Sequence, residues 1–226
     1  MFKTIATLFL GTAAAVIPAL AVDGTVLINQ SSVMAAGGFP FTITQSGSYK
    51  LSSNLQVPEG VNGININAND VTLDLNGFMI LGAITCGNSS NSCGPVPRNA
   101  VHGISALAVG ITIRNGHVRG FSRGVKIFGG LVEEMHVSGN LIDGIEGNDS
   151  VIRRNDASLN AGIGIQCFNC VVSENVATLN ASNGFNLGGG GVFSANSMKS
   201  SLGQGLEITQ LVVTTHNNSC DGFPCL

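Results

Sequence analysis

A repeat of about twenty residues dominates this sequence and constrains its fold more than any other feature. Gly followed by an apolar residue recurs in steps of 40, 21, 20, 20, 20 and 21 residues. Copies continue as apolar, polar, apolar, which is the pattern of a short strand with one buried face. The repeat predicts a solenoid with one such strand at the same place in every coil. The pairs are Gly63-Ile64, Gly103-Ile104, Gly124-Val125, Gly144-Ile145, Gly164-Ile165, Gly184-Phe185 and Gly205-Leu206.

Two rows of Asn follow the same period. One row contains Asn140, Asn160 and Asn180, and the other contains Asn155, Asn175 and Asn196. Asn tolerates left-handed turn conformations, and stacked copies can form hydrogen bonds along the stack. We therefore expect each row to mark a corner that recurs in every coil.

These motifs resemble those of a known group of proteins. The segments are Gly47-Ser-Tyr-Lys-Leu51, Gly63-Ile-Asn-Ile66, Val71-Thr-Leu-Asp-Leu-Asn-Gly77 and Ile111-Thr-Ile-Arg-Asn-Gly116, and Gly-apolar coils with Asn corners follow them. This pattern resembles the right-handed parallel β-helix proteins of the pectate-lyase-like superfamily. The resemblance covers residues 45–218. It implies an all-β, right-handed parallel β-helix solenoid of about seven to eight coils, but no single function, because that superfamily includes lyases, hydrolases, epimerases and adhesins.

The ends and one long step interrupt the period. Residues 22–44 are expected to form an N-terminal cap and residues 219–226 a C-terminal cap, since a solenoid must cover its open ends. The 40-residue step is interpreted as one coil with an insertion at about residues 82–100, carrying Cys86 and Cys93. A disulfide between these two cysteines would tie a loop that projects from the coils.

The first 21 residues have the features of a secretory signal peptide. Lys3 precedes an uncharged apolar stretch from Ile5 to Ile17, and Ala19-Leu20-Ala21 fits a cleavage site. This stretch is short for a bilayer span, and no later stretch is long enough for one. We expect cleavage near Ala21 and a secreted or periplasmic protein. The alternative is an uncleaved N-terminal anchor.

The six cysteines form three close pairs in the sequence: Cys86 with Cys93, Cys167 with Cys170, and Cys220 with Cys225. An even number of cysteines in an exported protein favours disulfides. Zinc is the rival interpretation, but only one pair has CxxC spacing and the pairs lie far apart in the sequence, so no metal site is predicted. Cys167 and Cys170 could also be small apolar residues in a core.

Charged residues one repeat apart should lie on adjacent coils, where opposite charges can pair. The expected pairs are Asp74–Arg114, Arg123–Asp143, Lys126–Glu146, Glu133–Arg153, Glu134–Arg154, Arg154–Glu174 and His136–Asp156. The residues left without an evident partner on a neighbouring coil are Asp70, Arg98, His102, His117, Arg119, Asp149, Lys199 and His216. Near the insertion, Asp74, Arg114 and His117 are the catalytic candidates, and Arg98, His102 and Arg119 are the ligand-binding candidates.

Several function classes find little support. Ten basic against 13 acidic residues disfavour nucleic-acid binding. A lyase of this superfamily would use Ca²⁺-binding carboxylates and a basic residue, but its Trp-containing motif cannot occur in a chain with no Trp. Hydrolase motifs with adjacent acidic residues are also missing; Glu133 and Glu134 are adjacent but are expected to point to opposite faces.

The remaining classes are binding and structural. Tyr49 and a few Phe are the available aromatic residues, and Phe is expected mostly inward, as at Phe185. We predict an exported β-helix with a non-catalytic surface or carbohydrate-interaction role, its partner a polysaccharide or cell-surface glycan. The alternative is a polysaccharide-active enzyme with an unfamiliar or degenerate site. No cofactor is expected, and Ca²⁺ would be relevant only to a lyase.

Overall fold

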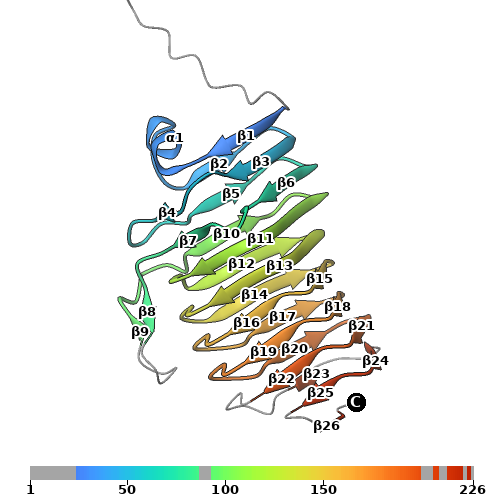
Figure 1. Ribbon diagram of the computed structural model, residues 1–226. Coiled ribbons are helices and arrows are strands. Elements are labelled where there is room, and N and C mark those ends of the chain that lie inside the picture. The colour runs from blue at the N-terminus through green and yellow to red at the C-terminus, as the bar shows by residue number, and fades with distance from the viewer. Residues whose placement is uncertain (1–23, 87–92, 200–205, 209–212, 221–222, 225–226) are drawn as a thin grey trace, which may run out of the picture.

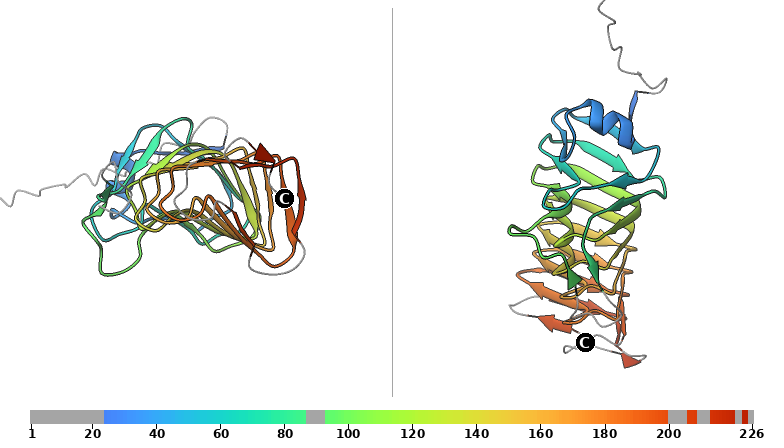
Figure 2. Two further views of the ribbon diagram at one scale, coloured as in Figure 1. Left: turned by 90° about the horizontal axis from the view of Figure 1, so that it is seen from below. Right: turned by 90° about the vertical axis from the view of Figure 1, so that its left-hand side faces the viewer.

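The computed structural model describes residues 24–86, 93–199, 206–208, 213–220 and 223–224. The chain forms a parallel β-solenoid of about eight turns, as the sequence predicted (Figure 1). Seen from below, the coils lie over one another, and seen from the side they form one elongated stack (Figure 2). Among the described residues, the one helix is far too short to cross a membrane.

One side of the solenoid is an eight-stranded parallel sheet, called sheet 1 below. Apart from β2, which lies in the segment expected to be a cap, it is built from the strands that the Gly-apolar repeat predicted. Its strands are β2 (Phe41–Ile43), β5 (Ile64–Ile66), β10 (His102–Ala106), β12 (Arg123–Phe128), β14 (Asp143–Asn148), β17 (Ile165–Phe168), β20 (Phe185–Gly188) and β23 (Leu206–Ile208).

The remaining sides belong to a 16-stranded sheet, which bends into two parts called sheets 2a and 2b below. The long strands β11 (Ile111–Arg119) and β13 (Gly130–Ser138) run through both parts. Sheet 2a also contains β1 (Thr25–Ile28), β3 (Gly47–Leu51), β6 (Val71–Asp74), β15 (Val151–Arg153), β18 (Val171–Ser173), β21 (Gly191–Ser194) and β24 (Val213–His216). Sheet 2b also contains β4 (Leu55–Gln56), β7 (Met79–Leu81), β16 (Asp156–Ser158), β19 (Val176–Thr178), β22 (Ser197–Lys199), β25 (Ser219–Cys220) and β26 (Phe223–Pro224).

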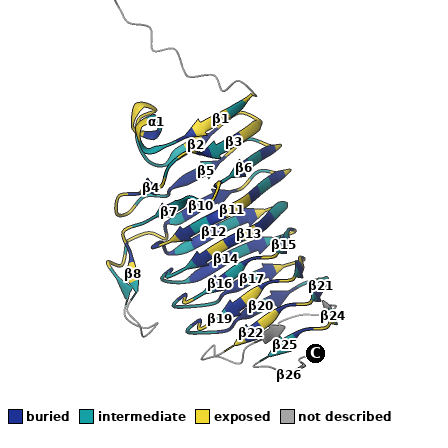
Figure 3. Cartoon of the chain, in the orientation of Figure 1, coloured by how far each residue is buried: buried dark blue, intermediate teal, exposed yellow. Residues whose placement is uncertain are grey.

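Buried residues recur from coil to coil (Figure 3), and the apolar ones among them form a core of stacked columns inside the coils. The column from sheet 1 contains the apolar residue of successive Gly-apolar pairs, and its members are paired in register and fully buried: Ile64, Ile104, Val125, Ile145, Ile165 and Phe185. Removing these side chains from water is the main stabilising contribution to such a fold.

The Gly of a Gly-apolar pair is required because adjacent coils approach each other closely at this position. A Cβ placed on Gly144 would lie 2.6 Å from the carbonyl oxygen of Gly164 and 2.8 Å from Nδ2 of Asn160. The carbonyl oxygen cannot retreat without disturbing the backbone pairing, and Nδ2 of Asn160 cannot retreat without disturbing the hydrogen bonds of its ladder. The period in the sequence therefore reflects contact between adjacent coils.

Both Asn rows are buried ladders of hydrogen bonds, and Asn218 extends the second row. Asn155 donates from Nδ2 to Oδ1 of Asn175 on the next coil at 3.0 Å and to the carbonyl of Val132 at 3.0 Å. The left-handed backbone, however, belongs to the residue before each ladder Asn, for example Arg154, Glu174 and Leu159. The Asn rows thus mark recurrent corners as expected, through hydrogen bonds of their amide side chains and not through a left-handed backbone of their own.

The N-terminal segment enters the sheets earlier than the boundary at residue 44 implied. β1 pairs in parallel with β3, and β2 pairs with β5. Between them, the helix α1 (Gln30–Ala35), capped by Asn29, lies at the N-terminal end of the stack (Figure 1). Only the part around this helix has the position expected of a cap.

The insertion forms a small antiparallel hairpin, β8 (Thr85–Cys86) with β9 (Cys93–Gly94), closed by the predicted Cys86–Cys93 disulfide. It projects from one side of the stack (Figure 1). Cys167 and Cys170 form a second disulfide, which the sequence left open. The expected signal peptide and Cys225, the expected partner of Cys220, lie outside the described residues. At the other end, β25 and β26 pair antiparallel.

Candidate functional site

Most charged residues pair across coils as the 20-residue spacing predicted. The confirmed pairs are Asp74–Arg114, Arg123–Asp143, Lys126–Glu146, Glu133–Arg153, Glu134–Arg154 and His136–Asp156. The expected Arg154–Glu174 pair is not formed among the described residues. Arg154 turns instead toward the preceding coil and contacts Glu133, with 2.7 Å between Nη2 and Oε2.

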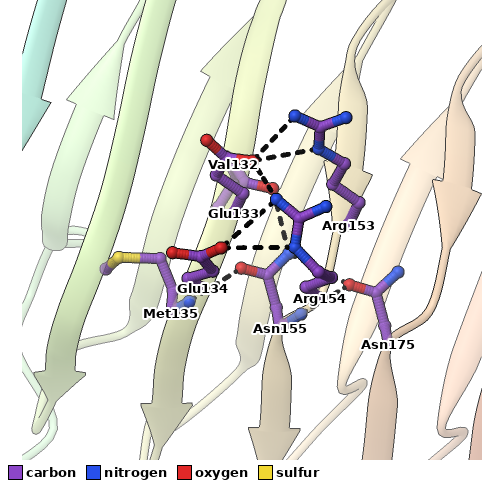
Figure 4. Close-up of polar contacts among 8 residues, drawn as sticks. All are labelled: Val132, Glu133, Glu134, Met135, Arg153, Arg154, Asn155 and Asn175. Carbon is purple, nitrogen blue, oxygen red and sulfur yellow. Dashed lines mark hydrogen bonds and ion pairs between the residues drawn. The ribbon is translucent and has the colours of Figure 1, made fainter.

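Glu133 is the most enclosed carboxylate of this network on sheet 2a (Figure 4). Its side chain is 11% exposed and pairs with both Arg153 and Arg154. Glu134 was expected on the opposite face, but its left-handed φ of 55° turns the chain, and Arg154 contacts it as well. The usual alternation of side chains fails at this bend, so both carboxylates face outward.

Two residues interpreted as unpartnered have partners on the next coil. The His117 ring stacks on the His136 ring, with the centroids 4.9 Å apart and the planes 13° from parallel. Burial, and secondarily the neighbouring His136, lower the pKa of His117. Asp149 accepts a hydrogen bond from Nδ2 of Asn169 at 3.1 Å.

The six residues proposed as site candidates do not share one surface. Asp74 and Arg114 lie in register on sheet 2a, His117 and Arg119 follow on sheet 2b, and His102 lies on sheet 1. Arg98 lies in the connection after the hairpin. The structure thus separates the catalytic candidates Asp74 and Arg114 from the ligand-binding candidate His102.

Asp74 already has several polar partners. Its Oδ1 accepts from the backbone N–H of Asn76 at 2.7 Å and from Nδ2 of Asn115 at 3.1 Å, while Oδ2 lies 3.4 Å from Arg114. These contacts hold the chain where it leaves β6. They give Asp74 an evident structural role at this corner.

Sheet 1 carries a different group of polar residues on its outer face. Lys126, Glu146, Gln166 and Asn186 form one row in register across β12, β14, β17 and β20. A second row at the ends of the same strands contains Phe128, Asn148, Phe168 and Gly188. Parallel pairing places the members of each row on successive coils about 4.8 Å apart.

Charges on this face are neutralised within a compact cluster. Nε of Arg123 lies 2.7 Å from Oε2 of Glu146 and 3.2 Å from Oδ2 of Asp143, and Nζ of Lys126 lies 3.1 Å from Oε1 of Glu146. Burial raises the pKa of Asp143, against the opposing effects of the Ile163 N–H and Arg123. Burial also lowers the pKa of His102, and Lys126 and Arg123 lower it further.

Beside this cluster the face is hollowed into a shallow depression of about 100 Å³. Its lining combines a carboxylate, amides and an aromatic ring, and the lining residues are Glu146, Gly147, Asn148, Gln166, Cys167, Phe168, Asn186 and Gly188. Gly188 follows Phe168 in the row and has no side chain, which leaves one side of the ring open. We call the depression and the adjacent exposed ring of Phe128 the sheet 1 groove.

The exposed rings are the feature that the sequence interpretation missed. Phe128 is 44% exposed and Phe168 is 45% exposed, whereas Phe was expected to point mostly inward. Each follows directly after an inward residue of its strand, Ile127 or Cys167. Alternation within the strand could therefore have identified both as outward, at positions 40 residues apart.

The described residues contain no cluster of three or more His, Cys, Asp or Glu side chains that could hold a metal ion. The sheet 1 groove presents amide and aromatic side chains, which suit hydrogen bonding and ring stacking.

Comparison with protein-family models and with curated proteins finds no match. Among solved structures, the periplasmic alginate epimerase AlgG is 14% identical, with a TM-score of 0.46 over 87% of this chain and 55% of that chain. A mutant of AlgG gives 15% and 0.48 over the same shares. The Dettilon tailspike protein is 14% identical, with a TM-score of 0.45 over 84% of this chain and 41% of that chain.

This chain therefore spans about half the length of these proteins or less. They are parallel β-helix proteins. The chain is itself a parallel β-helix protein, as its coils and sheet pairing show, consistent with the pectate-lyase-like resemblance of its sequence.

Proposed function

We propose that this protein binds a glycan along the sheet 1 groove, without chemical conversion of the glycan. The observation that carries the proposal is the pair of exposed rings, Phe128 and Phe168, on either side of Asn148 in one row. An exposed ring offers a flat apolar surface to the C–H face of a sugar, and neighbouring amides can bond to its hydroxyls.

The shape of the groove favours an extended chain over a small enclosed molecule. Its volume of about 100 Å³ is below that of pockets that enclose small ligands. The rows continue from coil to coil at a constant step, so successive units of a polymer can contact successive side chains of one row. The partner class is accordingly a polysaccharide or a cell-surface glycan.

The charge cluster favours binding over catalysis. Asp143, the carboxylate with a raised pKa, has a side chain only 5% exposed and is paired with Arg123. Glu146 is held by Arg123 and Lys126 together. A general acid or base must reach the substrate and change its protonation, and neither carboxylate is free to do so.

An exported location fits this proposal. Cys86–Cys93 and Cys167–Cys170 are both disulfides, and such bonds persist mainly in oxidising compartments outside the cytosol. The N-terminal sequence with Lys3 and the apolar stretch up to Ile17 points the same way. Glycans of cell surfaces and matrices are available to a protein in that location.

A binding screen tests the proposal directly. The full chain would be screened on a panel of immobilised neutral and acidic polysaccharides, and the affinity for a positive polymer measured by calorimetry. Phe168→Ala should weaken binding about tenfold, because it removes the ring beside the depression. Val171→Ala, an exposed apolar residue on sheet 2a, is the matched control and should leave affinity unchanged.

Three outcomes would refute this function. No binding to any polymer would exclude glycan recognition, and equal effects of Phe168→Ala and Val171→Ala would exclude the sheet 1 groove. Release of new reducing ends or unsaturated products from a bound polymer would replace the binding role by an enzymatic one.

A further inference from the structure

A second group of chemically active side chains lies on sheet 2b, away from the sheet 1 groove. His117, His136 and Asp156 occupy one outward row on three successive coils, in register through β11, β13 and β16. The two imidazole rings are stacked and nearly parallel, with centroids 4.9 Å apart. Neither ring has a role in the proposed glycan site.

Coordination of one metal ion by both rings requires one ring to rotate out of the stack, because the nitrogen lone pairs lie in the ring planes and are nearly parallel here. A transition metal binds imidazole nitrogen at about 2.0–2.1 Å, so two nitrogens on one ion lie within about 4 Å of each other. Adjacent parallel strands place the rings one coil apart. Rotation of the His117 ring about its side-chain torsions is needed to bring one of its nitrogens within that range of Nε2 of His136. His136 has a side chain 59% exposed, which leaves access from solvent.

The position of Asp156 beside His136 also supports a metal site. Its Oδ2 lies 3.7 Å from Nδ1 of His136, and its Oδ1 is buried without a hydrogen-bond partner. A carboxylate facing one ring nitrogen favours a proton there and leaves Nε2 as the lone-pair donor. Histidine ligands of metals commonly have such a carboxylate behind them, which orients the ring and raises its basicity.

We propose that His117 and His136 form a binding site for a divalent transition-metal ion, with Asp156 positioning His136. Two imidazoles and water suit Cu²⁺, Zn²⁺ and Ni²⁺, and Cu²⁺ should bind most tightly because affinity for such ligands rises toward copper. Asp156 acts through His136, which is why the row contains only two direct protein ligands. The site bridges β11 and β13, so an ion bound there also joins two coils.

Titration of tag-free full-length protein with CuCl₂ and ZnCl₂ tests this site. Calorimetry gives the affinity, and electron paramagnetic resonance of the Cu²⁺ complex should show coupling to two nitrogens. His117→Ala and His136→Ala should each lower the affinity by at least about 100-fold and leave at most one coupled nitrogen. Asp156→Asn should lower the affinity by about 10–100-fold with both nitrogens still coupled.

His216→Ala is the matched control, because His216 is exposed and lies on sheet 2a. It should bind both ions as the unmodified chain does. Circular dichroism of each variant checks folding, and His136→Gln serves if His136→Ala is unfolded. Equal affinity of the unmodified chain, His117→Ala and His136→Ala would overturn the proposal, as would loss of binding in His216→Ala. Phe168 lies on sheet 1, away from these histidines, so the metal titrations test this site whether or not the protein binds a glycan.

Discussion

At the scale of single residues, the ladder asparagines are the most demanding positions in the molecule. Asn175 is 1% exposed, and its Oδ1 accepts from both the backbone N–H and Nδ2 of Asn155. Its own Nδ2 donates to the carbonyl of Ile152 and to Oδ1 of Asn196. One amide thus satisfies four polar groups that are out of reach of water.

Asn175→Ala should therefore destabilise the protein by about 3 kcal/mol or more, since each buried group left unpaired costs about 1–3 kcal/mol. Urea unfolding followed by circular dichroism measures the change. Ser173→Ala, at a half-buried outward position on the same coil, should change stability by less than about 0.5 kcal/mol. If the two variants were equally stable, the ladder would contribute nothing to the fold.

The sequence predicted the members of these ladders apart from Asn218, but not the backbone around them. The spacing of Asn140, Asn160 and Asn180 was sufficient to predict that these residues stack on successive coils. The left-handed conformation at Leu159 has no signal in its own side chain, because Leu disfavours it. It is imposed by the neighbouring coils, whose hydrogen bonds fix the corner, and so lies beyond what local propensity can indicate.

At the scale of strands, ion pairs align one coil with the next. Glu133 on β13 joins Arg153 of β15 and Arg154 at the following bend. Glu133→Gln should lower the free energy of unfolding by about 1–3 kcal/mol, because it leaves two neighbouring guanidinium groups without an enclosed carboxylate. Glu134→Gln should have an effect below about 0.5 kcal/mol, because that side chain is 54% exposed.

Thermal and urea unfolding of both variants, at low and at high salt, provide the measurement. The difference between them should persist in high salt, since screening acts mainly on exposed charges. If Glu133→Gln and Glu134→Gln had the same free energy of unfolding, the burial of Glu133 would not strengthen its ion pairs.

Strand-level predictions succeeded where side chains alternate and failed where the chain bends. Lys126 and Glu146 lie in the regular part of sheet 1, and counting by 20 was enough to pair them. Glu134 lies at the bend in β13, so alternation assigned it to the wrong face. The outward rings of Phe128 and Phe168 were predictable from the same alternation. The depression at Phe168 was not, because it depends on the packing of three adjacent strands, β14, β17 and β20.

At the scale of the whole molecule, stability should be distributed over nearest-neighbour contacts between coils. The coil formed by residues 161–180 and the one before it, 141–160, present matching inward residues to their neighbours. Ile165 corresponds to Ile145, Val172 to Ile152, and Ala177 to Ala157. The junctions also match, because Ala161 donates its N–H to the carbonyl of Asn140 as Ala181 does to that of Asn160.

Deletion of residues 161–180 should therefore give a folded protein that is one coil shorter. Small-angle scattering should show an axis shorter by about 4.8 Å, and the urea m-value should fall in proportion to the surface lost. The shortened chain lacks Phe168 and should also lose its proposed glycan affinity. Deletion of residues 161–170 is the control, since removing half a coil puts every later strand on the wrong side and should abolish cooperative unfolding. If both deletions unfolded alike, the coils would not be the independent structural units that the 20-residue period implies.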